Sequence, residues 1–402
     1  MSTTTPLATG PLAGLKVLEV GSMYAGPFCG QLLGDMGATI TKVEAPGKPD
    51  TLRTWGHADK EDTSFFWGHL SRNKRCITLD VSKPEGREVF MKLAADYDVI
   101  VENFRGGNME KWGIGPEDVF AINPRIIYAR VSGFGQTGPY ANKPGFGVIA
   151  ECMSGLRSIT GYPDRPPVRA GISIADAVGG MFTAFGVTSA LHERTRSGKG
   201  QVVDTALYEG LFMLMNDFVA VYEALGVVKE PVGSTIPRVV PTGIYKTKDG
   251  EYVVPAAGSD PVFKRIAKVM GRPDLAEKYG RAQVRADHGE LVDGEVAGWI
   301  ASHSAEEVLA NLGEGDVPVF KVYRAPDILQ DPQFKAREML LPMEWPGIGT
   351  LHFPGIVPKL SRTPGNVRSH LPQMGEHNDQ VYRQELGLSE AEIAALQQKK
   401  VI

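Results

Sequence analysis

Short apolar segments of strand character alternate with helical patterns along the first third of the chain, and this alternation is the strongest constraint on the fold. Helical patterns follow the first strand, through about Met36, and the third, where Ser82, Pro84 and Glu85 provide a favourable helix start. The expected strands are residues 15–20, 38–44, 75–80, 98–102 and 125–131. Near-continuous apolar strands separated by helices predict an α/β fold, with a parallel sheet covered on both faces.

The remainder of the chain predicts a second, smaller α+β domain. Residues 1–226 form the first domain, with long helical patterns expected over 176–194 and 204–225. Residues 227–327 form the small domain, entered through a Pro/Gly/Val-rich linker at 227–242. Its expected elements are a hairpin that turns at Asp249-Gly250 and helices at 261–270, 290–302 and 304–312, with Ser304 as a cap. The segment 328–402 is Pro-rich and irregular until a last helix near 389–399.

Glycine accounts for 47 of the 402 residues, well above the usual share of about 7%. Such a surplus indicates turns and places where the backbone approaches another group closely. The first strand–turn–helix unit contains Gly21, Gly26 and Gly30. Their spacing is not that of the GxGxxG fingerprint for dinucleotides. We therefore interpret this unit as a tight turn in an α/β sheet rather than as an NAD site.

Charge and cysteine usage exclude several classes of partner. The 43 Lys and Arg residues against 47 Asp and Glu residues give a net charge of −4, so no basic field favours nucleic acid. Cys29, Cys76 and Cys152 lack CxxC spacing, and the first ten residues do not resemble a signal peptide. We expect a cytoplasmic protein with reduced thiols and no membrane span. No His lies between residues 70 and 191 and no HExxH occurs, so we expect no metal site.

Two groups of residues are candidates for ligand chemistry. Asn103, Phe104, Arg105 and Lys111 follow the strand at 98–102, and strand carboxyl ends are where α/β sheets bind ligands. Phe104 could stack on a base while Arg105 or Lys111 contacts phosphate, although a solvated charged loop would have the same composition.

Asp176 is the second candidate, near the start of an expected helix. A carboxylate there is usually an N-cap, but it could also act as a nucleophile. Gly179, Gly180 and Gly186 leave one face of that helix without side chains, which allows close approach by a ligand or by another helix.

An ordered set of motifs resembles the class III CoA-transferase family, which includes formyl-CoA and carnitine CoA-transferases and α-methylacyl-CoA racemases. The resemblance extends from about residue 11 to residue 390. The matching segments are 12–19, 25–27, 33–38, 42–44, 73–75, 101–105, 123–125, 132–139, 171–176, 198–204 and 375–377.

The resemblance implies a large Rossmann-like domain built from both ends of the chain, with residues 328–402 returning to it, and an interlocked homodimer. It implies that Asp176 attacks an acyl-CoA donor, giving an aspartyl anhydride and then an aspartyl-CoA thioester that a carboxylic acid acceptor consumes. It also places several residues where relatives contact coenzyme A, namely Met23, Tyr24, Leu79, Asn103, Phe104, Arg105 and Lys111.

Departures from the family pattern bear on the substrate. Racemase relatives carry a catalytic His where this chain has Phe146, within Gly145-Phe-Gly147, so racemase or epimerase activity is the less favoured alternative. Formyl-CoA transferases carry an acidic residue in place of Gly147, so formate chemistry is not implied. Arg169 or Arg238 could hold the distal carboxylate of a diacid, and we expect succinyl-CoA as donor. A non-catalytic CoA-binding subunit is the remaining alternative.

Overall fold

The computed structural model describes residues 8–61 and 63–402. The chain divides into two compact units, each described here by itself. The first unit consists of Met1–Leu156, Ala170–Phe218 and Glu338–Ile402, and the second of Arg157–Arg169 and Val219–Arg337.

A six-stranded sheet forms the centre of the first unit, with strand order β3-β2-β1-β4-β5-β6. All five strand pairings are parallel, which confirms the predicted α/β class. The strands are β1 (Lys16–Glu19), β2 (Thr39–Glu44), β3 (Lys74–Thr78), β4 (Val99–Glu102), β5 (Ile127–Ser132) and β6 (Gln201–Ala206).

The sixth strand corrects the expected helix at 204–225. Residues 201–206 pair with β5, and helices begin only at Leu207 and Phe218. The α8 helix ends at Gly198, which has φ +74°, and the chain then turns back along the sheet edge. Residues 201–206 form a strand because they pair with β5. Helical periodicity in the sequence gives no sign of this contact.

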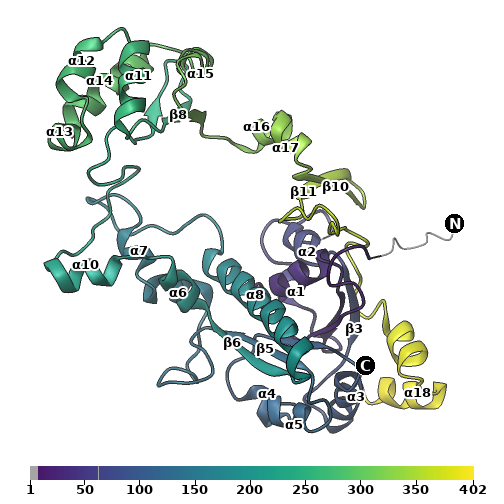
Figure 1. Ribbon diagram of the computed structural model, residues 1–402. Coiled ribbons are helices and arrows are strands. Elements are labelled where there is room, and N and C mark those ends of the chain that lie inside the picture. Colours follow the sequence, from purple (N-terminus) through teal and green to yellow (C-terminus); the bar gives the residue numbers. More distant parts are fainter. Residues whose placement is uncertain (1–7, 62) are drawn as a thin grey trace. The chain divides into compact units, whose positions relative to one another are not determined.

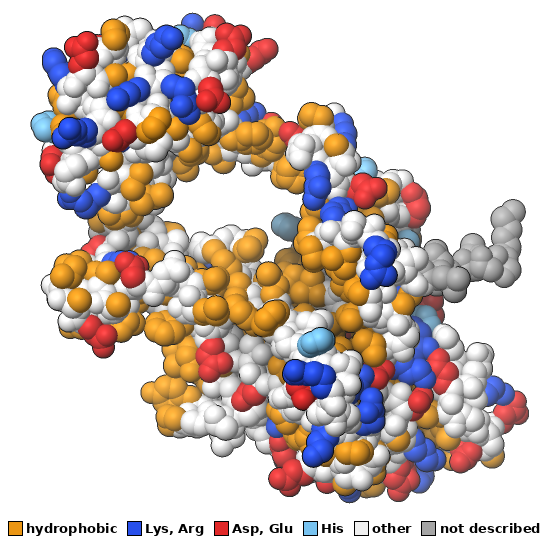
Figure 2. All heavy atoms as spheres, in the orientation of Figure 1, with side chains coloured by type: hydrophobic (Ala, Val, Ile, Leu, Met, Phe, Trp, Pro, Cys, Tyr) orange, Lys and Arg blue, Asp and Glu red, His pale blue; other side chains and the backbone are white. Residues whose placement is uncertain are grey.

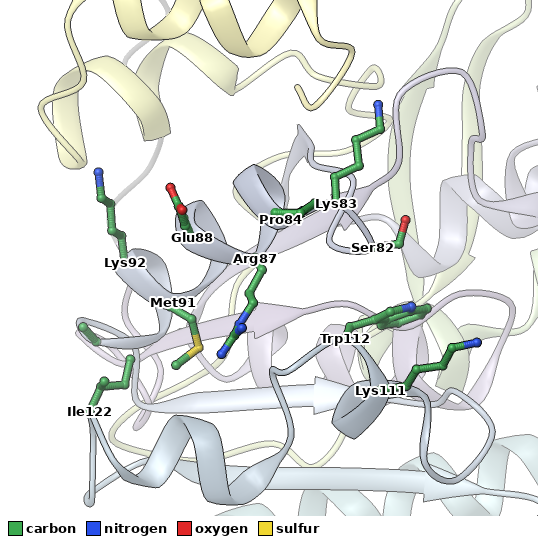
Figure 3. Close-up of a pocket in the computed structure, with 11 residues that line it drawn as sticks. Ser82, Lys83, Pro84, Arg87, Glu88, Met91, Lys92, Lys111, Trp112 and Ile122 are labelled. Atoms are coloured by element: carbon green, nitrogen blue, oxygen red, sulfur yellow. The ribbon is translucent and has the colours of Figure 1, made fainter.

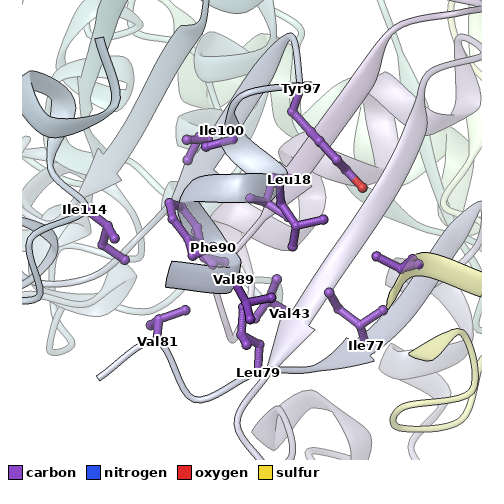
Figure 4. Close-up of a cluster of buried hydrophobic side chains, with 14 of the residues drawn as sticks. Leu18, Val43, Ile77, Leu79, Val81, Val89, Phe90, Tyr97, Ile100 and Ile114 are labelled. Atoms are coloured by element: carbon purple, nitrogen blue, oxygen red, sulfur yellow. The ribbon is translucent and has the colours of Figure 1, made fainter. Parts of the chain in front are cut away.

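Helices cover both faces of this sheet (Figure 1). On one face, α3 and the C-terminal residues pack on Leu18, Ile77 and Ile100 (Figure 4). On the other, α1 and α8 pack on Val17, Ile40 and Val99. The helices of this unit are α1 (Ala25–Asp35), α2 (Phe65–Leu70), α3 (Pro84–Ala94), α4 (Asn108–Lys111), α5 (Pro116–Phe120), α6 (Gly147–Met153), α8 (Ile174–Ser197), α9 (Leu207–Met213) and α18 (Glu390–Gln398), with a 3-10 turn at Thr51–Arg53 and a π-helix at Asp379–Glu385.

The glycines of α8 let other elements of the sheet layer approach it. A Cβ at Gly179 would lie 2.5 Å from Leu207, and one at Gly186 would lie 2.6 Å from Val203. Close packing against other elements therefore accounts for these two glycines. Approach by a ligand, the other alternative from the sequence, is not needed to explain them. By length and composition α8 is the one helix among the described residues that could cross a membrane. It packs against α1, α9, β5 and β6 on one side, and 33% of its apolar window is buried.

The second unit combines helices with a three-stranded antiparallel sheet, in the order β7-β8-β9. The predicted hairpin is confirmed, and Ser304 caps α15 by accepting a hydrogen bond from the Glu307 amide. The elements are β7 (Tyr245–Lys246), β8 (Tyr252–Pro255), β9 (Val319–Lys321), α10 (Phe218–Leu225), α11 (Asp260–Val269), α12 (Pro273–Tyr279), α13 (Ala282–Asp287), α14 (Gly289–Ala301), α15 (Ala305–Glu314), α16 (Ala325–Gln330) and α17 (Pro332–Ala336), while α7 (Leu156–Ile159) lies at the junction of the units.

The expectation of an irregular chain after residue 328 is wrong in part. Residues Leu340–Trp345 and Gly349–Pro354 form an antiparallel hairpin, β10–β11. Trp345 and Phe353 stack with ring centroids 5.9 Å apart and are buried with Met343. The hairpin depends on this aromatic packing, which the prolines in the sequence obscured.

Candidate active site

The strand order reverses between β1 and β4, and the loops that follow these two strands meet there. In open α/β sheets this crevice is where ligands bind. The loop after β1 carries Met23 and Tyr24, and the loop after β4 carries Asn103, Phe104 and Arg105. The structure thus brings most of the predicted coenzyme A residues to one end of the sheet.

The glycines of the β1–α1 turn accommodate side chains of the protein itself. A Cβ at Gly21 would lie 2.5 Å from Asn103 Oδ1, and one at Gly26 would lie 3.2 Å from the same amide group. Asn103 Oδ1 accepts from the Ser22 amide at 2.8 Å, and its Nδ2 donates to the Ser22 carbonyl at 2.7 Å. Asn103 therefore holds the turn that presents Met23 and Tyr24.

Asp176 is the third residue of α8, and the N-cap is Ser173, so the N-cap alternative for Asp176 is wrong. The Asp176 carboxylate rests against Gly147, the first residue of α6. A Cβ at Gly147 would lie 2.1 Å from Asp176 Oδ2 and 3.1 Å from Oδ1. Any side chain at position 147 would thus occupy the place of this half-buried carboxylate. Sequence reasoning noted Gly147 as a departure from relatives but did not predict its contact with Asp176.

Tyr24 lies on the same side of α8 as Asp176. Gly180 follows Asp176 by four residues and so shares its helix face. A Cβ at Gly180 would lie 2.8 Å from the Ala25 carbonyl oxygen, which sets the residue after Tyr24 against this face. Burial, and secondarily the negative charge of Asp176, raise the pKa of the Tyr24 phenol. Tyr24 and Asp176 therefore belong to one site.

The α2 helix packs behind Tyr24 and contains a histidine with a shifted pKa. Burial, reinforced by the charges of Arg72 and Lys74, lowers the pKa of His69 from 6.5 to about 4. The unfolded chain takes up this proton as the pH falls through about 6.5, whereas the folded protein does so only near 4. The stability linked to His69 is therefore present above pH 6.5 and is lost as the pH falls toward 4.

We expect the substitution His69→Gln to remove this part of the acid sensitivity. The wild-type free energy of unfolding should fall between pH 7 and pH 4.5 by about 2 kcal/mol more than that of the variant. Urea unfolding at the two pH values measures the difference, with the exposed His57→Gln as control. Equal pH dependence in His69→Gln and wild type would contradict the assignment.

Cationic side chains line a pocket of about 860 Å³ between α3 and α4 (Figure 3). Arg87 and Lys92 come from α3, and Lys111 and Trp112 from the end of α4. Lys83 also lines the pocket, but its ammonium donates to the Lys399 and Lys400 carbonyls at 2.8 and 2.9 Å. Arg87, Lys92 and Lys111 are therefore the cations left to bind an anion in this pocket, and Lys92 and Lys111 lie at its opposite ends (Figure 3).

A smaller pocket of about 190 Å³ lies at the carboxyl ends of β4 and β5. Arg105 borders it on one side, and the loop with Lys143 and Phe146 borders it on the other. Phe146 directly precedes Gly147, so this pocket approaches the Asp176 carboxylate. Sequence reasoning missed Lys143, although its place in the glycine-rich stretch from 133 to 147 was a signal.

The loop from Asn103 to Lys111 is held at both ends by ion pairs. Arg130 Nε lies 2.6 Å from Glu102 Oε1, and the same guanidinium pairs with Glu110. Glu102 Oε2 accepts from the Phe104 amide at 2.7 Å, and the Phe104 ring meets Trp112 edge to face at 5.1 Å. These contacts give Arg105 and Lys111 a rigid base.

Other predicted residues lie in different settings. The Leu79 side chain is buried in the hydrophobic cluster of Figure 4 and its amide donates to the Glu44 carbonyl at 2.7 Å, so its contact with coenzyme A stays a prediction. Arg169 and Arg238 belong to the second unit, where Arg238 lies 3.9 Å from Asp287. Their role toward a diacid stays a prediction. Among the described residues, no group of three or more His, Cys, Asp or Glu side chains could hold a metal ion.

Known proteins that are similar to this chain include CoA-transferases. The profile of CoA-transferase family III matches residues 12–378. The succinyl-CoA–D-citramalate CoA-transferase of Chloroflexus aurantiacus is 44% identical over 98% of both chains. The succinyl-CoA–L-malate CoA-transferase β subunit of the same organism is 40% identical over 100% of this chain and 99% of its own. A CaiB/BaiF family protein from Brucella suis superposes with a TM-score of 0.83 at 32% identity, covering 94% of this chain and 99% of its own. The chain belongs to CoA-transferase family III and is a CoA-transferase.

Proposed function

We propose that this enzyme moves coenzyme A from succinyl-CoA to a hydroxylated dicarboxylic acid, with Asp176 as the covalent nucleophile. The observation that carries the proposal is the close contact of the Asp176 carboxylate with Gly147, which we call its seat. In this contact Asp176 Oδ2 lies 2.1 Å from the position that a Cβ at residue 147 would take. This seat lies next to the small pocket at the carboxyl ends of β4 and β5. A half-buried carboxylate held beside a ligand crevice suits nucleophilic attack.

The transfer proceeds through four exchanges at acyl carbons. An Asp176 oxygen attacks the thioester carbonyl, the C–S bond breaks, and CoA leaves as a thiolate. The thiolate attacks Cγ of Asp176 in the resulting anhydride, which releases succinate and forms an aspartyl-CoA thioester. The acceptor carboxylate then displaces the thiolate from Cγ, and the thiolate attacks the acyl carbon of the acceptor. Asp176 is regenerated, and no net proton is consumed.

The two pockets suggest how coenzyme A lies. Its thioester must reach Asp176, so the pyrophosphate falls near Arg105 and Lys143 and the 3′-phosphate falls farther along, near Arg87 and Lys111. Phosphate groups favour such cations through charge-assisted hydrogen bonds. The Trp112 ring offers an apolar face within the same pocket.

We expect Lys111→Ala to raise KM for succinyl-CoA by about 10-fold with kcat unchanged, because one charge-assisted hydrogen bond to phosphate is lost. With succinyl-3′-dephospho-CoA the variant and the wild type should have equal KM values. Lys92→Ala, at the opposite end of the same pocket (Figure 3), is the matched control. A KM difference that persists with the dephosphorylated donor would assign Lys111 to another group.

The choice of acids rests on the relatives, which are named for D-citramalate and L-malate as acceptors. The decisive experiment is an activity matrix of acyl-CoA donors against carboxylic acids, read by mass spectrometry of the CoA esters. Succinyl-CoA with hydroxylated diacids should give the highest kcat/KM. Monocarboxylic acceptors that work equally well would contradict the proposed substrate class.

We also propose that the chain acts as a homodimer. Large apolar side chains are exposed on the first unit, including Phe146, Met181, Phe185 and Met213 at 55–68% exposure, and Figure 2 shows hydrophobic side chains gathered over α6 and α8. Patches of this kind mark interfaces. Native mass spectrometry should give twice the chain mass, and the purified chain alone should catalyse transfer. Activity only after a second, different chain is added would favour the subunit alternative.

A further inference from the structure

A network of fully buried charges lies beneath the turn that carries Met23 and Tyr24. Lys42 Nζ pairs with Asp50 Oδ2 at 2.7 Å and with Glu19 Oε1 at 3.1 Å, and it donates to the Gly21 carbonyl at 2.9 Å. The contacts with Glu19 and Gly21 are hydrogen bonds, and the contact with Asp50 is an ion pair. Glu19 has a second partner, Lys74, at 2.7 Å.

The Lys42–Asp50 pair forms hydrogen bonds with both ends of the Gly21–Met23 segment of this turn. Lys42 binds the Gly21 carbonyl, and Asp50 Oδ1 accepts from the Met23 amide at 3.0 Å. Ser22 between them is held by Asn103. The Gly21 carbonyl, the Ser22 amide and carbonyl, and the Met23 amide therefore each form a hydrogen bond with a side chain.

These hydrogen bonds hold Met23 in an unusual backbone conformation. Its φ is +66°, a left-handed conformation that is unfavourable for a residue with a Cβ. Such strain persists only where the surrounding contacts impose it, and it is concentrated at functional sites. One contact that holds Met23 in this conformation is the hydrogen bond from its amide to Asp50. The next residue is Tyr24, and Ala25 after it packs on the α8 face that bears Asp176.

We propose that Asp50 is a positioning residue for the transfer reaction, which holds the Gly21–Tyr24 turn in the shape that sets Tyr24 beside Asp176. This inference deepens the proposed function and rests on it for the catalytic readout. Asp50 itself is buried and touches no reacting group. Its effect reaches the site through the Met23 backbone.

The test compares Asp50→Asn with Asp35→Asn. Asp35 is an equally buried carboxylate, paired with Arg72 at 2.6 Å in the same unit but away from the turn. Asp50→Asn should lower kcat by about 100-fold, as expected when a catalytic geometry is displaced by about 1 Å. Asp35→Asn should keep kcat within about 3-fold of wild type at a temperature where both variants are folded.

A second readout reports the turn without relying on catalysis. The carbon-13 signal of the Tyr24 ring gives the phenol pKa by NMR titration, and burial next to Asp176 raises that pKa in the wild type. In Asp50→Asn it should move toward the ordinary tyrosine value, whereas in Asp35→Asn it should not move. The Tyr24 pKa reports the conformation of the turn whether or not Asp176 is the nucleophile. The role of Asp50 and the role of Asp176 can therefore be refuted independently.

A double variant guards against unfolding. Lys42→Met/Asp50→Ala removes both buried charges together, which proteins tolerate better than the loss of one partner. It should fold and show the same kcat loss and the same Tyr24 shift as Asp50→Asn. Wild-type kcat in a folded variant, or a kcat loss with the Tyr24 titration unchanged, would overturn the proposal. Failure of both variants to fold while Asp35→Asn folds would also overturn it, by assigning Asp50 to global stability.

Discussion

The substitution Asp176→Asn should reduce kcat by at least about 10⁴-fold, the scale of loss when a covalent nucleophile is removed. An amide is a poor nucleophile and cannot form the anhydride, although it fills the same space against Gly147. KM for succinyl-CoA should therefore change little, since the coenzyme A pockets are untouched. Steady-state kinetics measures both constants, and a thermal melt confirms that the variant is folded.

A chemical trap identifies the intermediate at the same position. Wild-type enzyme mixed with succinyl-CoA and hydroxylamine should carry a hydroxamate on Asp176, detectable by peptide mass spectrometry. Asp176→Asn should carry none. The control is Asp96→Asn, because Asp96 is a surface carboxylate with 73% side-chain exposure. A trapped group on another residue, or full activity in Asp176→Asn, would refute the nucleophile assignment.

The substitution Gly147→Ala should lower kcat strongly, although less than Asp176→Asn, because it displaces the carboxylate and does not remove it. The added methyl group would stand 2.1 Å from Asp176 Oδ2, so the carboxylate must leave its seat. A shift of about 1 Å in a reacting group can lower the rate by about 100-fold. We expect a kcat loss of at least that size with little change in KM for succinyl-CoA.

Backbone conformation does not oppose the Gly147→Ala change, because φ at Gly147 lies outside the left-handed region. The variant should therefore fold, and its thermal midpoint should stay near that of the wild type. Gly171→Ala is the matched control, since a Cβ there would meet nothing within 4 Å. A Gly147→Ala enzyme with the kcat of Gly171→Ala would disprove the role of this seat.

Many elements of the fold could be predicted from the sequence. The five segments predicted as strands became β1 to β5, because strands of a sheet covered on both faces are rich in apolar residues. The edge strand β6 was missed, since Val202 is partly exposed and the segment borders a helical pattern. The hairpin β10–β11 was missed because it depends on aromatic packing between Trp345 and Phe353.

The sequence predicted members for the candidate site but not their arrangement, and the roles of those members stay predictions. Ordered motifs pointed to Asp176 and to the loops around Asn103, and the strand order then brought these loops to one crevice. The glycine surplus indicated that other groups approach the backbone closely, but not which groups these are. The structure gives the partners: Asn103 against Gly21, Leu207 against Gly179 and Asp176 against Gly147.

By itself the sequence predicted the α/β class and the family, and the family resemblance proposed Asp176 as the nucleophile, because burial patterns and motifs are properties of neighbours along the chain. Only the tertiary structure decided that Gly147 seats that carboxylate and that Asp50 holds the Met23 backbone. Both contacts join residues far apart in sequence. They exist because packing of the helices on the sheet closes those distances, and no local pattern of residues records where such packing will bring two atoms together.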